Sequence, residues 1–363
     1  MSPPIKKIFG KEIFSELKNF DTVIDVRSPS EFLVDHIPGA VNLPVLNDSE
    51  RITVGTVYKQ IGPFEAKRLG AGLIAKNISF HIENRLSESP RDWKPLIYCW
   101  RGGSRSNAMS RIFSEIGWIT SVIDGGYKSY RGAVLETLNR IPKKLNLIKI
   151  SGKTGTGKTD ILRTAEKQGA QIIDLEQLAK HRGSLLGQEP NTLQPKQRLF
   201  ESRLCSAMLT LDLSRPVFIE AESNKIGQIH IPAELWARMR IASQVKIEVP
   251  IDERIKKLCL DYKHMIAEPK NVIVRLSRLK KRYGSKIFEK WKKYLETEDW
   301  YSFVKSLLKD HFDPSYTRSG NLGRGRVLLL LKPERLTKEE IETIAKELAD
   351  IDGTKRNKKL KIL

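Results

Sequence analysis

The loop formed by residues 152–159 (GKTGTGKT) constrains the fold more than any other part of this sequence, because it fits the pattern G-x-x-x-x-G-K-[ST]. An aliphatic run, residues 147–150, precedes it and a helical pattern follows, so we expect a buried strand that leads through the loop into a helix. In such a loop the backbone N–H groups cradle a diphosphate, the lysine neutralises it and the hydroxyl faces a Mg²⁺ ion. The candidate phosphate-binding residues are Gly152, Gly155, Gly157, Lys158 and Thr159.

Short aliphatic or β-branched runs alternate with helical patterns on both sides of this loop. They predict parallel strands at residues 23–26, 96–98 and 122–123, and again at residues 172–175, 217–219 and 245–249. The alternation predicts an α/β fold with two parallel-sheet units. We expect a first domain at residues 1–137, a linker at 138–146, a P-loop NTPase-like domain at 147–250, and a basic, mainly helical region at 251–363 with a frayed end.

A second loop carries a cysteine. Residues 99–106 (CWRGGSRS) follow a predicted strand and precede a helical pattern, so backbone N–H groups and a helix N-terminus converge there. Such a site favours a thiolate and stabilises an anionic group attached to sulfur. Cys99 is therefore the candidate catalytic residue, supported by Arg101, Gly102, Gly103 and Arg105. The alternative is a buried structural cysteine at a strand end, which the flanking glycines and arginines disfavour.

The charge of the chain points to a polyanionic partner. Its 363 residues include 64 lysines and arginines against 43 aspartates and glutamates, a net charge of +21 that attracts nucleic acids. Residues 275–293 hold nine basic residues and one acidic residue, with aromatic residues among them. Four of the basic residues recur at helical spacing and are candidates for RNA binding: Arg275, Arg278, Arg282 and Lys286. A solvated helix whose aromatic residues pack inward is an equally good interpretation of the charges.

Cysteine count and hydropathy exclude several classes of protein. The three cysteines, Cys99, Cys205 and Cys259, have no paired spacing, which excludes a disulfide framework and a cysteine-rich zinc site. Cys205 and Cys259 lie in helical patterns beside leucines and are interpreted as core residues. The longest aliphatic run, residues 327–331, is far too short to span a bilayer, and no signal peptide is evident. We therefore expect a cytoplasmic protein.

Two segments upstream of the cysteine resemble a known domain. Residues 25–32 (DVRSPSEF) and 36–42 (HIPGAVN) resemble the upstream signatures of rhodanese domains, and the loop at Cys99 matches their active-site position. Residues 124–127 (DGGY) match their closing segment. The resemblance implies a rhodanese-like first domain in which Cys99 carries sulfur or selenium as a persulfide or selenosulfide. Asp25, Arg27 and His36 are interpreted as structural residues that fix loops by hydrogen bonds.

Further motifs in the second half narrow the resemblance. They lie at residues 174–176 (DLE), 181–184 (HRGS), 194–197 (QPKQ) and 220–227 (EAESNKIG). With residues 127–131 (YKSYR) they make residues 23–316 similar to the bacterial tRNA 2-selenouridine synthase family, from which Ser104 departs because a larger apolar residue is expected there. The motif residues are Asp174, His181, Arg182, Gly183 and Ser184. Glu220 and Glu222 stand where a second acidic signature belongs, without its usual aspartate, and are candidates for binding a metal ion or substrate.

What this resemblance implies is replacement of sulfur by selenium in wobble 2-thiouridine of certain tRNAs, with selenophosphate as donor. It also implies S-geranylation of that base with geranyl diphosphate, which the phosphate loop would hold. No tightly bound cofactor is expected: selenophosphate and geranyl diphosphate are substrates, and Mg²⁺ is a candidate ion. The partners are tRNA and a selenophosphate synthetase as candidate selenium supplier. Two other functions stay open on the residues alone: an ATP-dependent rhodanese-type tRNA sulfurtransferase, and a non-catalytic tRNA-binding module.

Overall fold

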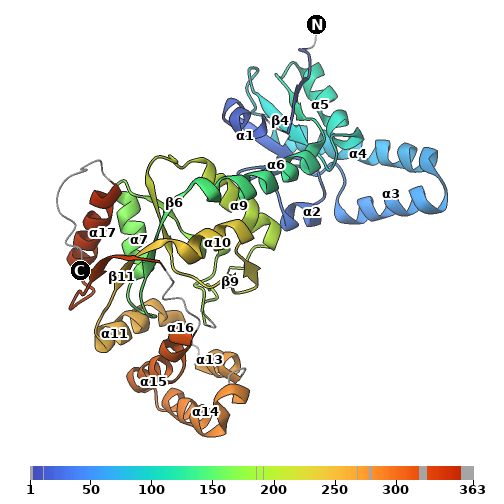
Figure 1. The fold of residues 1–363 in the computed structure, drawn as a ribbon. Coiled ribbons are helices and arrows are strands. Elements are labelled where there is room, and N and C mark those ends of the chain that lie inside the picture. Colours follow the sequence, from blue (N-terminus) through green and yellow to red (C-terminus); the bar gives the residue numbers. More distant parts are fainter. Residues whose placement is uncertain are drawn as a thin grey trace. The chain divides into compact units, whose positions relative to one another are not determined.

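The computed structural model describes residues 3–10, 12–184, 186–190, 192–267, 269–277, 280–318 and 325–352 (Figure 1). The chain forms two compact units, one of Met1–Leu138 with Lys196–Ser206, the other of Asn139–Pro195 with Ala207–Leu363. The boundary between the units falls inside the segment expected to be a linker. That segment is regular structure, because it holds the end of α6 (Gly126–Arg140), a 3₁₀ turn, η2 (Pro142–Lys144), and the start of a strand.

The first unit is built on a parallel five-stranded sheet in the order β1-β5-β4-β2-β3. Its strands are β1 (Lys6–Ile8), β2 (Thr22–Asp25), β3 (Val41–Asn42), β4 (Pro95–Tyr98) and β5 (Ser121–Ile123). The helices of this unit are α1 (Ile13–Glu16), η1 (Leu17–Asn19), α2 (Pro29–Val34), α3 (Asp48–Gln60), α4 (Pro63–Arg85), α5 (Ser104–Ile116), α6 and most of α9 (Gln197–Leu209). The three strands predicted here are confirmed, and β1 and β3 are additional.

Helices α3 and α4 form an antiparallel hairpin that extends away from the sheet of this unit (Figure 1). The Asn47 side chain accepts a hydrogen bond from the Glu50 N–H at 2.8 Å, which caps the start of α3. Across the hairpin, the Asn77 amide donates to Glu50 Oε2 at 2.8 Å and to the Val45 carbonyl at 3.1 Å. These bonds fix the end of the hairpin that adjoins the sheet.

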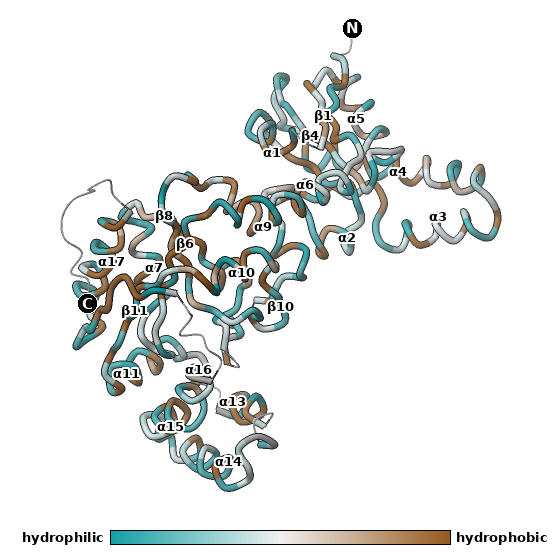
Figure 2. The backbone as a smooth tube through the Cα atoms, in the orientation of Figure 1, coloured by the Kyte–Doolittle hydropathy of each residue, from teal (hydrophilic) through white to brown (hydrophobic). Residues whose placement is uncertain are grey.

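The second unit contains another parallel five-stranded sheet, in the order β12-β11-β6-β8-β7. Its strands are β6 (Asn146–Ser151), β7 (Gln171–Ile173), β8 (Pro216–Glu220), β11 (Ser243–Ile247) and β12 (Val327–Leu331). The accompanying elements are α7 (Lys158–Lys167), α8 (Leu175–Ala179), α10 (Ala233–Ile241) and a small hairpin of β9 (Lys225–Ile226) and β10 (Ile229–His230). Figure 2 shows hydrophobic stretches along the central strands, as expected for a sheet buried on both faces. The four predicted strands are confirmed.

A series of helices separates β11 from β12. It comprises α11 (Ile251–Asp261), α12 (Lys263–Ile266), α13 (Pro269–Leu276), α14 (Lys280–Glu296), α15 (Trp300–Leu307), the π-helix η4 (Leu308–Phe312) and α16 (Asp313–Arg318). The chain then returns to the sheet, where β12 pairs with β11, and α17 (Lys338–Asp352) packs against α7.

The prediction of a separate, mainly helical region from residue 251 onward is therefore wrong in part. Residues 327–331, considered in the sequence only for their membrane-spanning potential, add a parallel strand to the edge of the P-loop sheet. Their aliphatic side chains suit an edge strand that is partly covered by α17. Residues 353–363, which include the lysine-rich tail, lie outside the described residues. In the described parts of the chain no helix is long and apolar enough to cross a membrane.

Candidate active site

Cys99 lies directly after β4, in the loop that leads into α5. It is buried, and the Ser106 hydroxyl donates a hydrogen bond to its sulfur at 3.2 Å. The Tyr127 N–H donates to the Cys99 carbonyl at 2.8 Å, which ties the loop to the start of α6. Gly126 has φ +58°, and a Cβ there would collide with that same carbonyl oxygen, so the predicted closing segment needs glycine at this point. Ser106 belongs to the cysteine loop, but it was not among the predicted site residues.

The two arginines of the cysteine loop have different environments. Arg105 Nη1 donates to Glu31 Oε2 at 2.8 Å, and Arg51 of α3 lies 3.3 Å from the same oxygen. Burial alone would raise the pKa of Glu31, but the hydrogen bond and charge of Arg105, the Ser28 N–H and the charge of Arg51 together lower it, so the carboxylate stays charged. Arg101 is exposed. Of the two, Arg101 is therefore available to an anionic substrate, whereas Arg105 holds the loop in place.

The residues interpreted as structural in this unit do fix loops. Arg27 and Asp25 form a fully buried ion pair at 2.6 Å, and Arg27 Nη2 also donates to the Asp35 carbonyl. The His36 ring stacks on Phe32, and its Nδ1 lies 2.8 Å from the Phe32 carbonyl oxygen.

The phosphate loop of the second unit connects β6 to α7 as the motif predicts. Gly155 and Gly157 have φ of +84° and +74°, a backbone conformation that favours glycine. Lys158 Nζ donates to the Gly152 carbonyl at 2.9 Å, and the Gly152 N–H donates to the Tyr316 hydroxyl at 3.0 Å. The ammonium group of Lys158 thus donates a hydrogen bond to a backbone carbonyl of its own loop.

Helix α11 packs against the phosphate loop and forms a hydrogen bond with it. Arg254 is buried, and its Nε donates to the Thr154 carbonyl at 2.8 Å while its Nη2 contacts Asp313 Oδ1 at 2.6 Å. A Cβ on Gly155 would lie 2.9 Å from the Arg254 carbonyl oxygen, so α11 approaches the loop closely enough to require glycine. Because Arg254 and Asp313 lie about 100 and 160 residues beyond the loop, nothing near the motif predicts this support.

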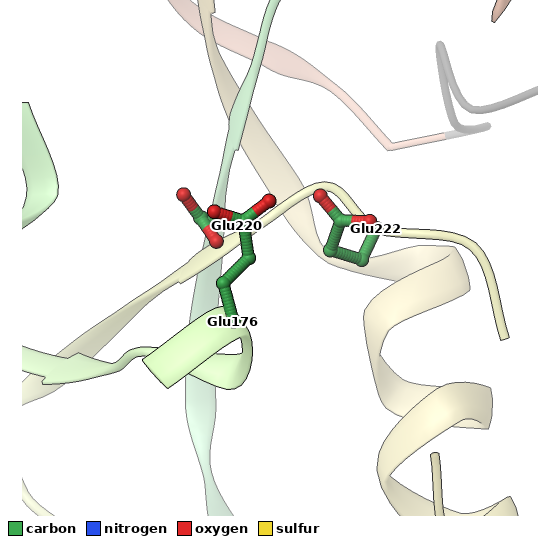
Figure 3. A group of neighbouring side chains, drawn as sticks. All are labelled: Glu176, Glu220 and Glu222. Atoms are coloured by element: carbon green, nitrogen blue, oxygen red, sulfur yellow. The ribbon is translucent and has the colours of Figure 1, made fainter. Parts of the chain in front are cut away.

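Three glutamates meet beside Thr159 (Figure 3). The Thr159 hydroxyl lies 2.5 Å from Glu220 Oε1 and 3.2 Å from Glu176 Oε2, and one carboxylate oxygen each of Glu176, Glu220 and Glu222 lies within 4.8 Å of the others. Glu220 is 1% exposed, and its Oε2 has no hydrogen-bond partner among the described residues. Burial, and then the neighbouring charges of Glu222 and Asp174, raise the pKa of Glu220 to about 8.

Asp174, predicted as a motif residue without a role, fixes the start of α8. Its side chain accepts from the Gln177 N–H at 2.8 Å, which caps α8, and it pairs with Arg163 Nε at 2.7 Å. Two residues later, Glu176 faces the glutamate cluster, and burial raises its pKa as well. The DLE motif therefore contributes its glutamate to the site and its aspartate to the helix start, a division that the spacing alone did not reveal.

The HRGS motif forms one wall of the site. Arg182 pairs with Glu189 at 2.7 Å and lies over the Tyr262 ring at 5.1 Å. Gly183 has φ +65°, and a Cβ there would lie 2.5 Å from Glu222 Oε2. Arg182, Gly183 and Ser184 line the cavity described next, whereas His181 is half-buried outside its lining, and burial lowers its pKa.

Two adjoining cavities lie at this site. The larger, about 860 Å³, is bordered by the phosphate loop, Glu176, Glu222 and the HRGS motif. The smaller, about 60 Å³, is apolar and shares with it Thr154, Ser184, Leu258, Tyr262 and Phe312. The rest of its lining is Leu186, Cys259, Met265, Ile266, Val272, Trp300, Phe303, Val304, Leu307 and Leu308. A large cavity with polar and apolar lining, next to the phosphate loop, therefore adjoins a small apolar cavity in the same unit.

The two cysteines interpreted as core residues lie in apolar surroundings. Cys205 is buried, and burial raises the pKa of its thiol to about 12. Cys259 is half-buried in the wall of the smaller cavity.

The predicted basic face is not one continuous helix. Arg275 lies in the last turn of α13 and is half-buried, whereas Lys286 is exposed in α14. Between Arg282 and Lys286, Gly284 has φ +78° and kinks α14, so the helical spacing that joined the four residues in sequence does not hold in space. Arg278 and the side chain of Arg282 lie outside the described residues.

The aromatic residues of this region face inward. Trp291 is buried and its Nε1 donates to the Ser306 hydroxyl at 3.0 Å, while the Tyr283 hydroxyl lies 2.7 Å from His311 Nδ1. Tyr294 packs against the same cluster. The interpretation of each aromatic residue as a packing residue is therefore confirmed.

Comparison with known proteins places the two units in known families. The family model described as tRNA 2-selenouridine synthase AAA domain matches residues 145–342, and the model described as rhodanese-like domain matches residues 11–133. The tRNA 2-selenouridine synthase of Nitrosomonas europaea is 36% identical over 250 residues, which cover 66% of this chain and 63% of that protein. This match spans somewhat less than two thirds of the relative's length.

Other relatives match over more of their length. The tRNA 2-selenouridine synthase of Psychromonas ingrahamii is 30% identical, covering 81% of this chain and 86% of that protein. The synthase of Bdellovibrio bacteriovorus is 32% identical, covering 88% of this chain and 93% of that protein. Since the AAA-domain model spans more than half of the chain and these relatives match both units, the chain belongs to the tRNA 2-selenouridine synthase family.

Proposed function

We propose that this protein replaces sulfur by selenium in the wobble 2-thiouridine of tRNA, from selenophosphate, by way of S-geranylation with geranyl diphosphate. The observation that carries the proposal is the apolar cavity that adjoins the phosphate-loop cavity. A nucleotide needs polar groups around its base and ribose, whereas a terpenyl diphosphate needs an apolar recess next to a diphosphate site. Its prenyl chain exceeds 60 Å³, so the recess must widen or receive only the end of the chain.

In the first step, the thiouridine sulfur attacks carbon 1 of geranyl diphosphate, the diphosphate leaves with the bonding electrons, and the base releases its N3 proton to solvent. Lys158 and the loop N–H groups oppose the charge that develops on the leaving diphosphate. For this, Lys158 must exchange its bond to the Gly152 carbonyl for the phosphate. Alkylation also makes the sulfur a better leaving group from the pyrimidine C2.

In the second step, the selenium of selenophosphate attacks that carbon and geranylthiolate leaves with the bonding electrons. Water then cleaves the selenium–phosphorus bond, so that phosphate is released and 2-selenouridine remains. Cys99 is proposed to hold the selenium donor at that carbon, because it lies between β4 and α5 and its sulfur accepts a hydrogen bond from Ser106. Exposed Arg101 would attract the selenophosphate anion. A selenophosphate synthetase would supply that donor.

A divalent cation fits the glutamate cluster. Thr159, Glu176, Glu220 and Glu222 offer the hard oxygen ligands that Mg²⁺ prefers, and the buried, unpartnered Glu220 Oε2 fits a ligand that the described residues do not supply. When bound, Mg²⁺ would neutralise diphosphate charge. The four side chains would hold the ion, and Lys158 would complete the neutralisation.

The decisive experiment is competition for the phosphate loop in the purified full-length protein. We expect geranyl diphosphate to displace a labelled diphosphate ligand more effectively than ATP or GTP does, and Lys158→Ala to weaken binding of all of them. Tighter ATP binding with hydrolysis during turnover would contradict the proposal and favour the ATP-dependent sulfurtransferase. Full activity after loss of Cys99 would favour a non-catalytic role for the first unit.

The apolar recess has its own test. Cys259→Phe fills the smaller cavity and should weaken geranyl diphosphate binding without changing the affinity for inorganic diphosphate. Leu260→Phe is the matched control, since Leu260 is exposed on the same helix. If Cys259→Phe lowers the affinities for geranyl diphosphate and for inorganic diphosphate equally, the apolar recess does not hold the prenyl chain.

A further inference from the structure

The end of the α3–α4 hairpin farthest from the sheet carries a surface that the proposed chemistry does not use. We call the hairpin tip the group of exposed residues Tyr58, Lys59, Ile61, Phe64, Lys67 and Arg68. We infer that the hairpin tip is an RNA-docking surface, which holds the tRNA substrate while the cysteine loop acts on one of its bases. This inference rests on the proposed function for its partner.

The apolar side chains of the hairpin tip have no role in the core. Tyr58, Ile61 and Phe64 are 58%, 70% and 71% exposed. Moreover, none of the thirteen residues of α3, all of which the structure describes, is buried. A helix that buries nothing gains little from apolar side chains, and neighbouring exposed apolar residues mark an interaction surface.

The chemistry of the hairpin tip favours RNA. The exposed cations Lys59, Lys67 and Arg68 accompany the two exposed rings, and the acid Glu65 is paired with Arg68 at 2.6 Å. Aromatic rings beside cations suit unpaired bases and their phosphates, because rings stack on bases and cations neutralise phosphates. A second copy of this chain fits less well, because its charge of +21 would repel the first copy.

The hairpin is also anchored beside the cysteine loop. Glu31 accepts from Arg105 of that loop at 2.8 Å and contacts Arg51 of α3 at 3.3 Å. Near the start of α3, Asp48 Oδ1 accepts from the Ser30 hydroxyl at 2.5 Å. With a rise of 1.5 Å per residue, the length of α3 places the tip about 20 Å from this anchor. An RNA stem–loop of ordinary width reaches both points, so the tip would orient the substrate without touching the reacting base.

The first test compares tRNA affinity in full-length variants at one fixed salt concentration. We expect the double variant Tyr58→Ala/Phe64→Ala to bind tRNA at least about fivefold more weakly, the loss that one stacked base predicts. Phe80→Ala is the matched control, because Phe80 is 54% exposed on the same hairpin but lies near its anchored end. Circular dichroism of all variants establishes that the helices are retained.

The second test identifies what contacts the tip. A photoreactive benzoylphenylalanine at position 64 should crosslink to tRNA. If the wild type binds tRNA and the double variant binds it with the same affinity, the inference about the hairpin tip is overturned and the proposed function is not. A crosslink between two protein chains, with unchanged tRNA affinity, would overturn it in favour of self-association. A wild-type protein that does not bind tRNA would overturn both this inference and the proposed function.

Discussion

The Ser106 hydroxyl and the Cys99 sulfur are partners across the cysteine loop, at 3.2 Å. A hydroxyl that donates to sulfur stabilises negative charge there, so in the proposed reaction Ser106 would act through Cys99, as a positioning residue. Both residues lie close together in sequence. The motif therefore predicted the loop around Cys99, but the hydrogen bond from Ser106 depends on the folded geometry and was not predicted.

We expect Cys99→Ala to abolish selenium incorporation while leaving tRNA affinity nearly unchanged, because it removes the thiol that holds the selenium donor and no surface charge. Mass spectrometry of tRNA nucleosides after incubation with selenophosphate and geranyl diphosphate measures the product. Cys205→Ala serves as control, since Cys205 is a buried thiol whose raised pKa keeps it protonated. Selenouridine formed at the wild-type rate by Cys99→Ala would contradict the assignment.

The glutamate cluster predicts how stability depends on pH in metal-free protein. Folding raises the pKa of Glu220 from its usual 4.5 to about 8, so between these values the folded state keeps a proton that the unfolded state has lost. The free energy of unfolding should therefore fall by roughly 1 kcal/mol per pH unit as pH rises from about 5.5 to 7.5.

Urea unfolding in the presence of a chelator, at several pH values, measures this slope. Glu220→Gln cannot lose the proton, so it should flatten the slope. Glu253→Gln on α11 should not, because the hydrogen bond from Lys256 lowers the pKa of Glu253 and it is already charged throughout this pH range. A slope that persists unchanged in Glu220→Gln would place its origin in other groups. Added Mg²⁺ should raise the stability of the wild type most at the upper end of the range, where the carboxylates are charged.

At the scale of elements, α11 holds the phosphate loop through buried Arg254. Arg254→Met should lower the free energy of unfolding by about 1–3 kcal/mol, because it removes the donor to the Thr154 carbonyl and one of the cations that pair with Asp313, which keeps its ion pair with Lys153. It should also weaken diphosphate binding by at least tenfold. Lys256→Met is the control, since its ion pair with Glu253 is exposed and contributes about 0–1 kcal/mol. Diphosphate affinity that survives in Arg254→Met would show that the loop keeps its shape unaided.

Sequence and structure agree best where an element and its signal are contiguous. The strand at residues 147–150, its glycine loop and α7 follow one another, so the motif predicted all three. By contrast, Glu176, Arg254 and Tyr316 come from three separate elements, and only the folded chain brings them to the loop. The basic residues show a different kind of error. Their regular spacing in the sequence predicted one helical face, but Gly284, at φ +78°, interrupts the helix between them.

At the scale of the whole molecule, the charge of +21 predicts salt-sensitive RNA binding. Each phosphate that the protein neutralises releases a counterion, so binding weakens as the salt concentration rises. With several such contacts, the affinity for tRNA should fall roughly a thousandfold between about 50 and 200 mM salt. Charge reversal of Arg278, Arg282 and Lys286 together should weaken binding to many tRNAs alike. Filter binding across a salt series measures both effects. An unchanged dissociation constant in the triple variant would leave the hairpin tip and other surfaces as the main RNA contacts.

The return of the chain to form β12 and α17 has a consequence for synthesis on the ribosome. The strand β6 and helix α7 emerge early. Strand β12, which pairs with β11, and helix α17, which packs against α7, are translated more than 150 residues after them. Until then, the nascent P-loop sheet has an open edge and an uncovered apolar helix face. A gene fragment that stops at residue 250 should therefore yield insoluble protein, whereas one that continues through Asp352 should not.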